Sequence, residues 1–266
     1  MRRGEVKKGT ATALVTGASS GIGYCIAERL AALGYDLIAV SRDERELSQA
    51  AARIGEKHGV RVDSFTLDLA REGAARELYE RCRGREIDVL INNAGMFIFN
   101  DILRCEPERL ERIVYLHDMT NTLTCRLFGA DMARRGKGYI LNMSSYSIWM
   151  PWPGLAAYSA SKAYLKSFSV AFAKEVRERG VRVTAVCPAG VATELYGLPH
   201  RFQRLGVRLG VLITADKTAR QALRALFRGR RLIVPAWYNR LFIPLIRLIP
   251  PALLRFARRK TMQFQK

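Results

Sequence analysis

The stretch TGASSGIG at residues 16–23 follows the apolar run ATALVT at 11–16 and opens a segment with apolar residues at helical spacing over 22–33. Glycine lets the backbone turn tightly and approach a ligand, and the start of a helix offers unpaired N–H groups and positive potential. Such a turn after a first strand is typical of pyrophosphate binding, although an ordinary strand-to-helix turn is the alternative. We therefore expect a dinucleotide site that includes Gly17, Ser19, Ser20, Gly21, Ile22 and Gly23.

Short apolar runs alternate with longer amphipathic stretches along the rest of the chain. This pattern predicts strands at 11–16, 36–41, 60–67, 87–91, 139–143, 181–187 and 231–234. It predicts helices at 22–33, 44–57, 108–135, 157–179 and 216–227, and one that ends near 83. Near-continuous apolar strands between helices indicate an α/β fold, a Rossmann-type doubly wound parallel sheet of about seven strands with helices on both faces, in a single domain. The connection over 191–214 lacks strong periodicity, and we expect a substrate lid there.

Composition narrows the functional classes. The 266 residues carry a net charge of +20, which points to an anionic cofactor, an anionic membrane or nucleic acid as a partner. The five cysteines are odd in number and show neither CxxC nor Cys/His ligand spacing, so we expect no disulfide framework, no metal site and a reducing, cytoplasmic location. The sequence shows no secretory signal and no apolar run of about 18 residues, so no transmembrane helix is predicted.

The residues after the second predicted strand bear on the choice of cofactor. NAD-selective sites place an acid at this point, where it accepts hydrogen bonds from the ribose hydroxyls. This chain has Ser41 and Arg42 instead, and an arginine can bind a 2′-phosphate through several donors. We therefore favour NADP(H) over NAD(H). The alternative is a solvated Arg42, and an inward-pointing Asp43 would weaken the prediction.

The sequence YSASK at 158–162 begins a long predicted helix, and its spacing places Tyr158 and Lys162 on one helix face. A free tyrosine has a pKa near ~10, and a neighbouring ammonium group favours the phenolate. Tyr158 and Lys162 are thus candidates for an acid/base pair. Ser145 follows the predicted strand at 139–143 and could hold a substrate oxygen. An ordinary helix with a surface lysine is the alternative.

Taken in order, these motifs resemble the short-chain dehydrogenase/reductase family over roughly residues 12–195. The resemblance rests on TGASSGIG at 16–23, DL at 68–69, NNAG at 92–95, SS at 144–145, the YxxxK pair, and Pro188 to Thr193. It implies NAD(P)-dependent hydride transfer to or from a carbonyl carbon, with Ser145, Tyr158 and Lys162 as catalytic residues and Lys162 on the nicotinamide ribose. It further implies adenine contacts from Asp68 and Leu69, a cofactor groove lined by Asn93, Ala94 and Gly95, and nicotinamide contacts from Val191 and Thr193.

Within the family, WMPWP at 149–153 and ILNMSS at 140–145 look most like the branch of 17β-hydroxysteroid dehydrogenases and very-long-chain 3-ketoacyl-CoA reductases. This resemblance implies a bulky lipid ketone or alcohol, such as a 3-ketoacyl chain, a keto-sphingoid base or a steroid. It also implies a homodimer or homotetramer formed through the helices at 108–135 and 157–179. A non-catalytic, membrane-associated dinucleotide-binding protein of the same fold is the alternative, against which the intact Ser-Tyr-Lys set argues.

His117 departs from the family pattern. The family usually carries an asparagine at this place, where it helps to hold a proton-relay water near the lysine, and here Asn121 lies one turn later. Histidine can donate and accept hydrogen bonds, and it could add a group that titrates near neutral pH. We therefore count His117 as a candidate catalytic residue. A histidine that is merely packed in the helix is the alternative.

The last stretch, residues 237–266, mixes apolar and aromatic residues with several arginines, and three prolines interrupt it. We divide the chain into an oxidoreductase domain at 1–236 and a basic amphipathic tail at 237–266. Such a composition suits an anionic membrane interface, so we expect peripheral membrane association. The alternative is an arm packed on the domain or on a second subunit. Nucleic acid is not expected, because bulky aliphatic residues accompany the charge and no binding motif is present.

Overall fold

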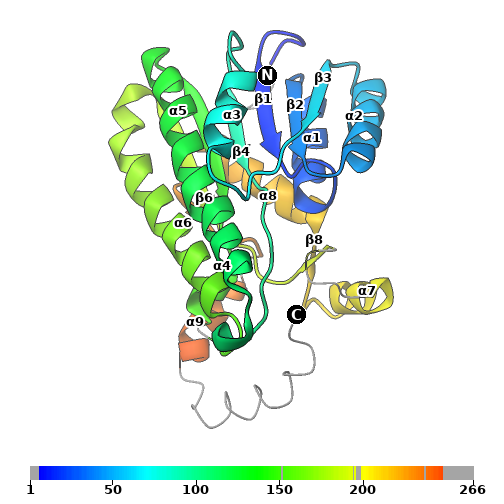
Figure 1. The fold of residues 1–266 in the computed structure, drawn as a ribbon. Coiled ribbons are helices and arrows are strands. Elements are labelled where there is room, and N and C mark those ends of the chain that lie inside the picture. Colours follow the sequence, from blue (N-terminus) through cyan, green and yellow to red (C-terminus); the bar gives the residue numbers. More distant parts are fainter. Residues whose placement is uncertain (1–5, 151, 194, 196–198, 237, 248–266) are drawn as a thin grey trace.

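A single parallel sheet forms the centre of the computed structural model, which describes residues 6–150, 152–193, 195, 199–236 and 238–247. Seven strands lie in the order β3-β2-β1-β4-β5-β6-β9, and every neighbouring pair is parallel (Figure 1). The strands are β1 Thr12–Thr16, β2 Asp36–Ser41, β3 Val62–Thr66, β4 Val89–Asn92, β5 Gly138–Met143, β6 Val181–Val186 and β9 Leu232–Ile233. All seven predicted strands are present, with ends that differ from the predicted ones by up to two residues.

Helices cover both faces of this sheet, as the apolar character of the strands predicts. On β1, Ala13 and Val15 contribute to a core with α1, α2 and α8, whereas Leu14 contributes to a second core with α3, α5 and α6. The single Rossmann-type domain is thereby confirmed. The helices are α1 Gly21–Ala32, α2 Glu44–His58, α3 Ala74–Arg81, α4 Pro107–Val114, α5 Asn121–Arg134, α6 Ala156–Glu175, and α8 Ala215–Phe227.

The strand order reverses between β1 and β4, because β2 and β3 lie on one side of β1 and β5 and β6 lie beyond β4. Ligands of open α/β sheets bind outside the carboxyl ends of the strands at such a point. The glycine turn at 16–23 follows β1, and the NNAG segment at 92–95 begins at the last residue of β4. The fold therefore brings the two motifs together.

The predicted helix at 108–135 is interrupted. A π-helical turn, Tyr115–Thr120, separates α4 from α5. The side chain of Asn121 donates from Nδ2 to the carbonyl oxygens of Leu116 at 3.2 Å and His117 at 2.7 Å. These bonds satisfy carbonyl groups in the π turn, and π turns often occur at functional sites. The expectation of one regular helix is corrected accordingly.

The connection at 191–214 has more regular structure than its sequence suggests. It contains helix α7 His200–Arg208, enclosed between β7 Val191–Ala192 and β8 Ile213–Thr214, which pair in parallel. A nine-residue helix offers too few turns for a clear periodic pattern, which explains why it was missed.

The beginning of the predicted tail contacts the domain. Helix α9 Asn239–Arg247 follows β9, and the hydroxyl of Tyr146 donates to the carbonyl of Asn239 at 2.6 Å. Ile243 packs on the cluster around Tyr146 and Val234. The rest of the tail, 248–266, lies outside the described residues. Within the described residues, none of the helices has the length and apolar character required to traverse a bilayer.

Candidate active site

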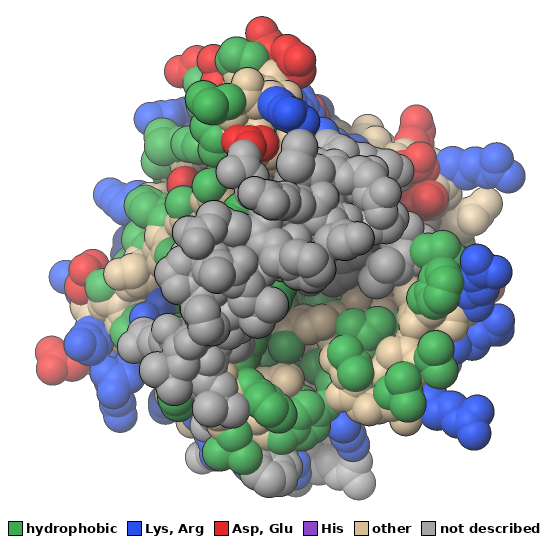
Figure 2. Space-filling model, turned by 90° about the horizontal axis from the view of Figure 1, so that it is seen from below, with side chains coloured by type: hydrophobic (Ala, Val, Ile, Leu, Met, Phe, Trp, Pro, Cys, Tyr) green, Lys and Arg blue, Asp and Glu red, His purple; other side chains and the backbone are tan. Residues whose placement is uncertain are grey.

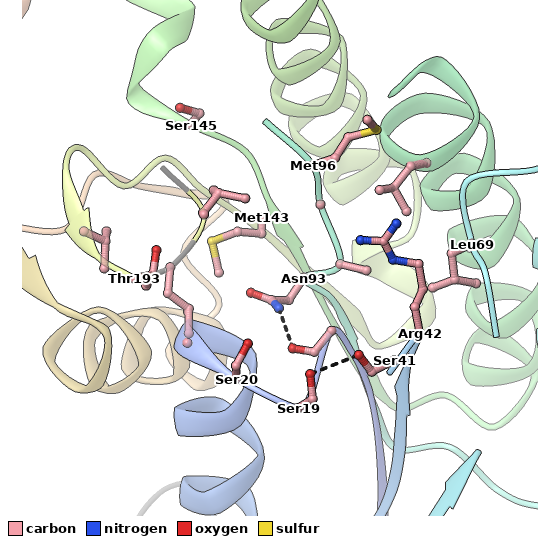
Figure 3. Close-up of a pocket in the computed structure, with 18 of the residues that line it drawn as sticks. Ser19, Ser20, Ser41, Arg42, Leu69, Asn93, Met96, Met143, Ser145 and Thr193 are labelled. Atoms are coloured by element: carbon pink, nitrogen blue, oxygen red, sulfur yellow. Dashed lines mark hydrogen bonds between the residues drawn. The ribbon is translucent and has the colours of Figure 1, made fainter. Parts of the chain in front are cut away.

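A cleft of about 390 Å³ opens at the carboxyl ends of the strands (Figure 3). It collects almost every residue that the sequence proposes for the site. The lining includes Gly17, Ser19, Ser20, Gly21, Ile22, Arg42, Asp68, Leu69, Asn93, Ala94, Gly95, Ser145, Tyr158, Lys162, Val191 and Thr193. Two proposed residues, Gly23 and His117, lie behind the cleft wall and support it.

The glycine turn is built for close backbone contacts. Gly17 has a left-handed φ of 65°, and a Cβ there would lie 2.9 Å from Nδ2 of Asn93. A Cβ on Gly23 would lie 2.0 Å from the carbonyl oxygen of Gly17, so only glycine allows α1 to begin this close to β1. Asn93 in turn donates from Nδ2 to the carbonyls of Thr16 at 3.1 Å and Gly17 at 3.2 Å. The turn is therefore held in shape by the residues after β4.

The first turn of α1 faces the cleft with an open N-terminus. Ser20 is its N-cap residue, but its side chain makes no capping hydrogen bond, and the first turn contains no acidic residue. Unpaired N–H groups at such an end favour an anion. The hydroxyls of Ser19 and Ser41 lie 3.0 Å apart at the adjacent wall (Figure 3). This glycine-lined cradle fits the pyrophosphate of a dinucleotide.

The opposite end of the cleft carries Asp68 and Arg42. Burial alone would raise the pKa of Asp68, but hydrogen bonds from the Ala70 N–H and the Arg112 guanidinium, together with the charge of Arg42, lower it. Arg42 is exposed at the cleft edge. The Asp43 carboxylate caps α2 by accepting the N–H of Glu46 at 2.7 Å. The carboxylate of Asp43 therefore interacts with the positive end of the α2 dipole. For this reason it opposes a bound phosphate less strongly than a free carboxylate would.

Ser145, Tyr158 and Lys162 all line the cleft. Ser145 is buried, and its Oγ accepts the N–H of Ser147 at 3.1 Å, which leaves its own hydrogen to donate. The Tyr158 ring is also buried and lies edge-on to Phe97 with 4.9 Å between ring centres. Nζ of Lys162 lies 5.9 Å from the centre of the Tyr158 ring. The spacing predicted from YxxxK thus places both side chains on the same wall.

Lys162 is almost completely enclosed. Its Nζ donates to the carbonyl of Met143 at 2.9 Å, and its own carbonyl accepts the hydroxyl of Ser144. Burial lowers the pKa of Lys162 from 10.5 to about 8, and the nearby charge of Asp118 offsets part of this effect. The ammonium form therefore still predominates at neutral pH, where it favours a tyrosine phenolate beside it.

Residues 11–198, more than half of the chain, match the sequence model of the short chain dehydrogenase family. The chain belongs to the short-chain dehydrogenase family. Its glycine turn, NNAG segment and YxxxK pair, which lie apart in the sequence, line one cleft in this family member.

Curated relatives agree with the predicted branch of short-chain dehydrogenases. The very-long-chain 3-oxoacyl-CoA reductase of Pyricularia oryzae is 36% identical over 185 residues, which cover 68% of this chain and 56% of the relative. The 17-beta-hydroxysteroid dehydrogenase type 3 of Danio rerio is 31% identical over 224 residues, which cover 82% and 70%. The chain spans less than two thirds of the length of several curated reductases that it matches.

Solved structures of short-chain dehydrogenases share the whole fold. A short-chain dehydrogenase from Sphingobium yanoikuyae, solved in complex with NADPH, is 32% identical with a TM-score of 0.78, and 95% of each chain is covered. The bulky-bulky ketone specific alcohol dehydrogenase from Comamonas testosteroni is 30% identical with a TM-score of 0.76, and 91% of this chain and 96% of that chain are covered. The similarity therefore includes the region after the family match.

His117 is completely buried in the π turn, behind Gly95 and Lys162. Its Nε2 accepts the N–H of Met96 at 3.1 Å, so the ring proton is on Nδ1, which contacts Oγ of Ser161 at 2.8 Å. Burial lowers the pKa of His117 well below 6.5, and the charge of Lys162 lowers it further. The expectation of a group that titrates near neutral pH is thus not met by His117, whose ring stays neutral.

Two polar features, one half-buried and one buried, were not anticipated from the sequence. Asp118 follows His117, and burial raises its pKa to about 6 although the charge of Lys162 opposes this. Asn142 of β5 accepts from Asn92 of β4 at 2.8 Å and donates to Ser169 of α6 at 2.8 Å. This network fixes α6, and with it Tyr158 and Lys162, to the centre of the sheet. The sequence signal for this network was the presence of Asn92 and Asn142 in strands that are otherwise apolar.

Proposed function

We propose that this short-chain dehydrogenase is an NADP(H)-dependent carbonyl reductase or alcohol dehydrogenase, acting between a ketone and a secondary alcohol of a lipid-like substrate. The observation that carries the proposal is that Ser145, Tyr158 and Lys162 line the same cleft as the glycine-lined cradle. The names of the curated relatives are those of lipid-ketone reductases and steroid dehydrogenases, which supports a 3-ketoacyl, keto-sphingoid or steroid substrate.

The residues of the cleft have separable roles. NADP(H), when bound, supplies or accepts the hydride. Ser145 donates its free hydroxyl hydrogen to the substrate oxygen, and Tyr158 gives that oxygen a proton during reduction or removes it during oxidation. Lys162 favours the ionised form of Tyr158 and can bond the nicotinamide ribose. Val191 and Thr193 would meet the nicotinamide amide, while Asp68, Leu69 and the NNAG segment line the adenosine side.

His117 acts in this proposal as a positioning residue with a neutral ring. It joins the backbone after β4, through Met96, to Ser161 on α6, and the hydroxyl of Ser161 donates to the carbonyl of Tyr158 at 3.0 Å. The chain of bonds therefore runs from the cofactor groove to the backbone of the catalytic tyrosine. In this proposal His117 takes the place of the family asparagine. It holds the segment after β4 and α6 in position relative to each other, and it does not carry a proton.

Arg42 supports the preference for NADP(H) over NAD(H). It is a cation at the adenosine end of the cleft, where a 2′-phosphate would lie, and the Sphingobium relative was solved with NADPH. Glu46 also lines this end, and titration with both cofactors measures the combined effect of the two opposite charges on binding. The five cysteines are all free thiols, which supports a reducing, cytoplasmic location. Assembly into a homodimer or homotetramer through the helices at 108–135 and 157–179, which correspond mainly to α4, α5 and α6, also belongs to the proposal.

The test is a screen of purified full-length protein with NADPH and NADH side by side. The ketones are a 3-oxoacyl-CoA, a keto-sphingoid base, a steroid ketone and a small soluble aryl ketone, and the readout is cofactor oxidation. Tyr158→Phe is the inactive comparison, and Tyr164→Phe, which alters an exposed tyrosine of the same helix, is its matched control. Tight NADPH binding without turnover of any ketone would instead favour the non-catalytic alternative.

A further inference from the structure

Large apolar side chains are exposed around the mouth of the cleft. On and after α7, Phe202, Leu205, Leu209 and Val211 have exposed fractions of 50%, 51%, 67% and 72%. Seen from below, the molecule gathers hydrophobic side chains on this face and carries charged side chains of both signs at its outline (Figure 2). An exposed apolar cluster of this size in a protein usually marks an interaction site.

The same helix is basic. Arg201, Arg204 and Arg208 are exposed on α7, and the sequence from Leu195 to Ala215 contains neither aspartate nor glutamate. The opposite side of α7 faces inward, where Gln203 is buried and Gly206 lies against Leu212. The outer side therefore combines apolar and cationic residues, and we refer to Arg201, Phe202, Arg204, Leu205, Arg208, Leu209 and Val211 as the α7 surface.

The composition of the α7 surface indicates which kind of partner it can bind. A second copy of the chain that paired its own α7 surface with this one would bring arginines against arginines, and a polyanion such as nucleic acid would leave Leu209 and Val211 in water. An anionic bilayer satisfies both parts, because headgroup phosphates attract the arginines while the apolar side chains enter the acyl boundary. Helix α9 adds two more exposed apolar residues, Leu241 and Phe242.

We propose that the α7 surface docks this protein on an anionic lipid bilayer with the cleft mouth against the lipid. Leu195 connects the two features, since it lines the cleft and is 42% exposed. A ketone dissolved in the bilayer then enters the cleft without crossing water. The inference deepens the proposed function by naming the surface through which its substrate arrives.

The experiment is vesicle flotation of the full chain, without cofactor or ketone, on vesicles of phosphatidylcholine alone and with phosphatidylserine. Leu205→Asn/Leu209→Asn removes apolar contact, and Arg204→Glu/Arg208→Glu reverses two charges. Lys174→Glu/Arg177→Glu is the matched control, because it makes the same charge change in a basic groove formed by α6 and the residues before β9. Turnover of the soluble aryl ketone is measured separately for every variant.

We expect the parent to float with phosphatidylserine vesicles, both α7 variants to bind them about tenfold or more weakly, and the control to bind as the parent does. Turnover of the soluble ketone should be unchanged in the control and retained at a measurable level in both α7 variants, which shows that they are folded. Equal binding by the parent and the α7 variants would overturn the proposal. An equal loss of binding in the control would also overturn it, because it would show that the total charge of the protein, and not the α7 surface, determines binding. If the protein turns over ketones but does not float, docking is refuted and the proposed function stands. If it floats but turns over no ketone, the proposed function is refuted and docking stands.

Discussion

The N–H of Met96 donates to Nε2 of His117, and this bond places the single ring proton of the histidine on the side of Ser161. Both nitrogens are therefore engaged by groups of the protein. A histidine in this state cannot take part in proton transfer without breaking a buried hydrogen bond, which costs about 1–3 kcal/mol. Its contribution is consequently one of position.

Replacing His117 with alanine should lower kcat by about tenfold or more and leave NADPH affinity nearly unchanged. The pH–rate profile should keep its position, because the histidine is neutral throughout the neutral range. His117→Asn should recover part of the loss, since an amide also donates and accepts. The comparison is His58→Ala at the end of α2, and an unaltered kcat in His117→Ala would end the hypothesis.

Lys162 should make stability depend on pH. Its pKa is lowered from 10.5 to about 8 by burial in the folded chain, so between these pH values the unfolded chain binds one proton more. The free energy of unfolding then rises with pH across this window, by roughly 3 kcal/mol for this group. Denaturant unfolding at several pH values should show the rise in the parent relative to Lys162→Met. Lys174→Met, at an exposed lysine of the same helix, should show the same rise as the parent. Parallel curves of unfolding free energy against pH for the parent and Lys162→Met would contradict the assignment of the rise to Lys162.

Two helical glycines should respond in opposite directions to alanine. A Cβ on Gly23 would lie 2.0 Å from the Gly17 carbonyl, so Gly23→Ala must displace the turn, and we expect a lower melting temperature and loss of NADPH binding. A Cβ on Gly55 of α2 would meet its nearest neighbour at an ordinary 3.5 Å. Gly55→Ala should therefore stabilise the chain by about 0.5–1 kcal/mol. Calorimetry and cofactor titration test both, and retained NADPH binding by Gly23→Ala would show that the turn tolerates a shift.

Arg42→Ala should weaken binding of NADPH and leave that of NADH nearly unchanged. A charge-assisted bond to the 2′-phosphate contributes about 1.5–3 kcal/mol, reduced here because Arg42 is exposed, so a loss of about threefold to tenfold is expected. Fluorescence titration of both cofactors gives the ratio. Arg76→Ala removes an exposed arginine of α3 as the control, and an equal effect on both cofactors would contradict the role of Arg42 in discrimination.

The sheet and the cleft residues could be predicted because they depend on local patterns. Apolar strands, glycines with special backbone geometry and the four-residue spacing of Tyr158 and Lys162 are all properties of short segments. The π turn could not be predicted, because the apolar spacing of the segment gives no sign of the bonds that Asn121 donates to the carbonyls of Leu116 and His117 in the folded chain.

The state of His117 was also beyond the sequence. Its neutral ring results from burial and from Lys162, which is 45 positions away in the chain. The polar network of Asn92, Asn142 and Ser169 likewise joins two strands and a helix that are distant in sequence. Helix α7 was missed for a different reason, since a short amphipathic segment between glycines has little periodic signal.

Val191 and Ile213, which pair between β7 and β8, form a hydrophobic cluster against which Ile22 of the first turn of α1 packs. The base of α7 and the phosphate-binding turn therefore share one set of contacts. A dinucleotide held at that turn would restrain β7, β8 and the base of α7 before any ketone is present. We therefore expect an ordered kinetic mechanism, in which the nucleotide binds first and leaves last. Product-inhibition patterns would reveal this order of binding and release.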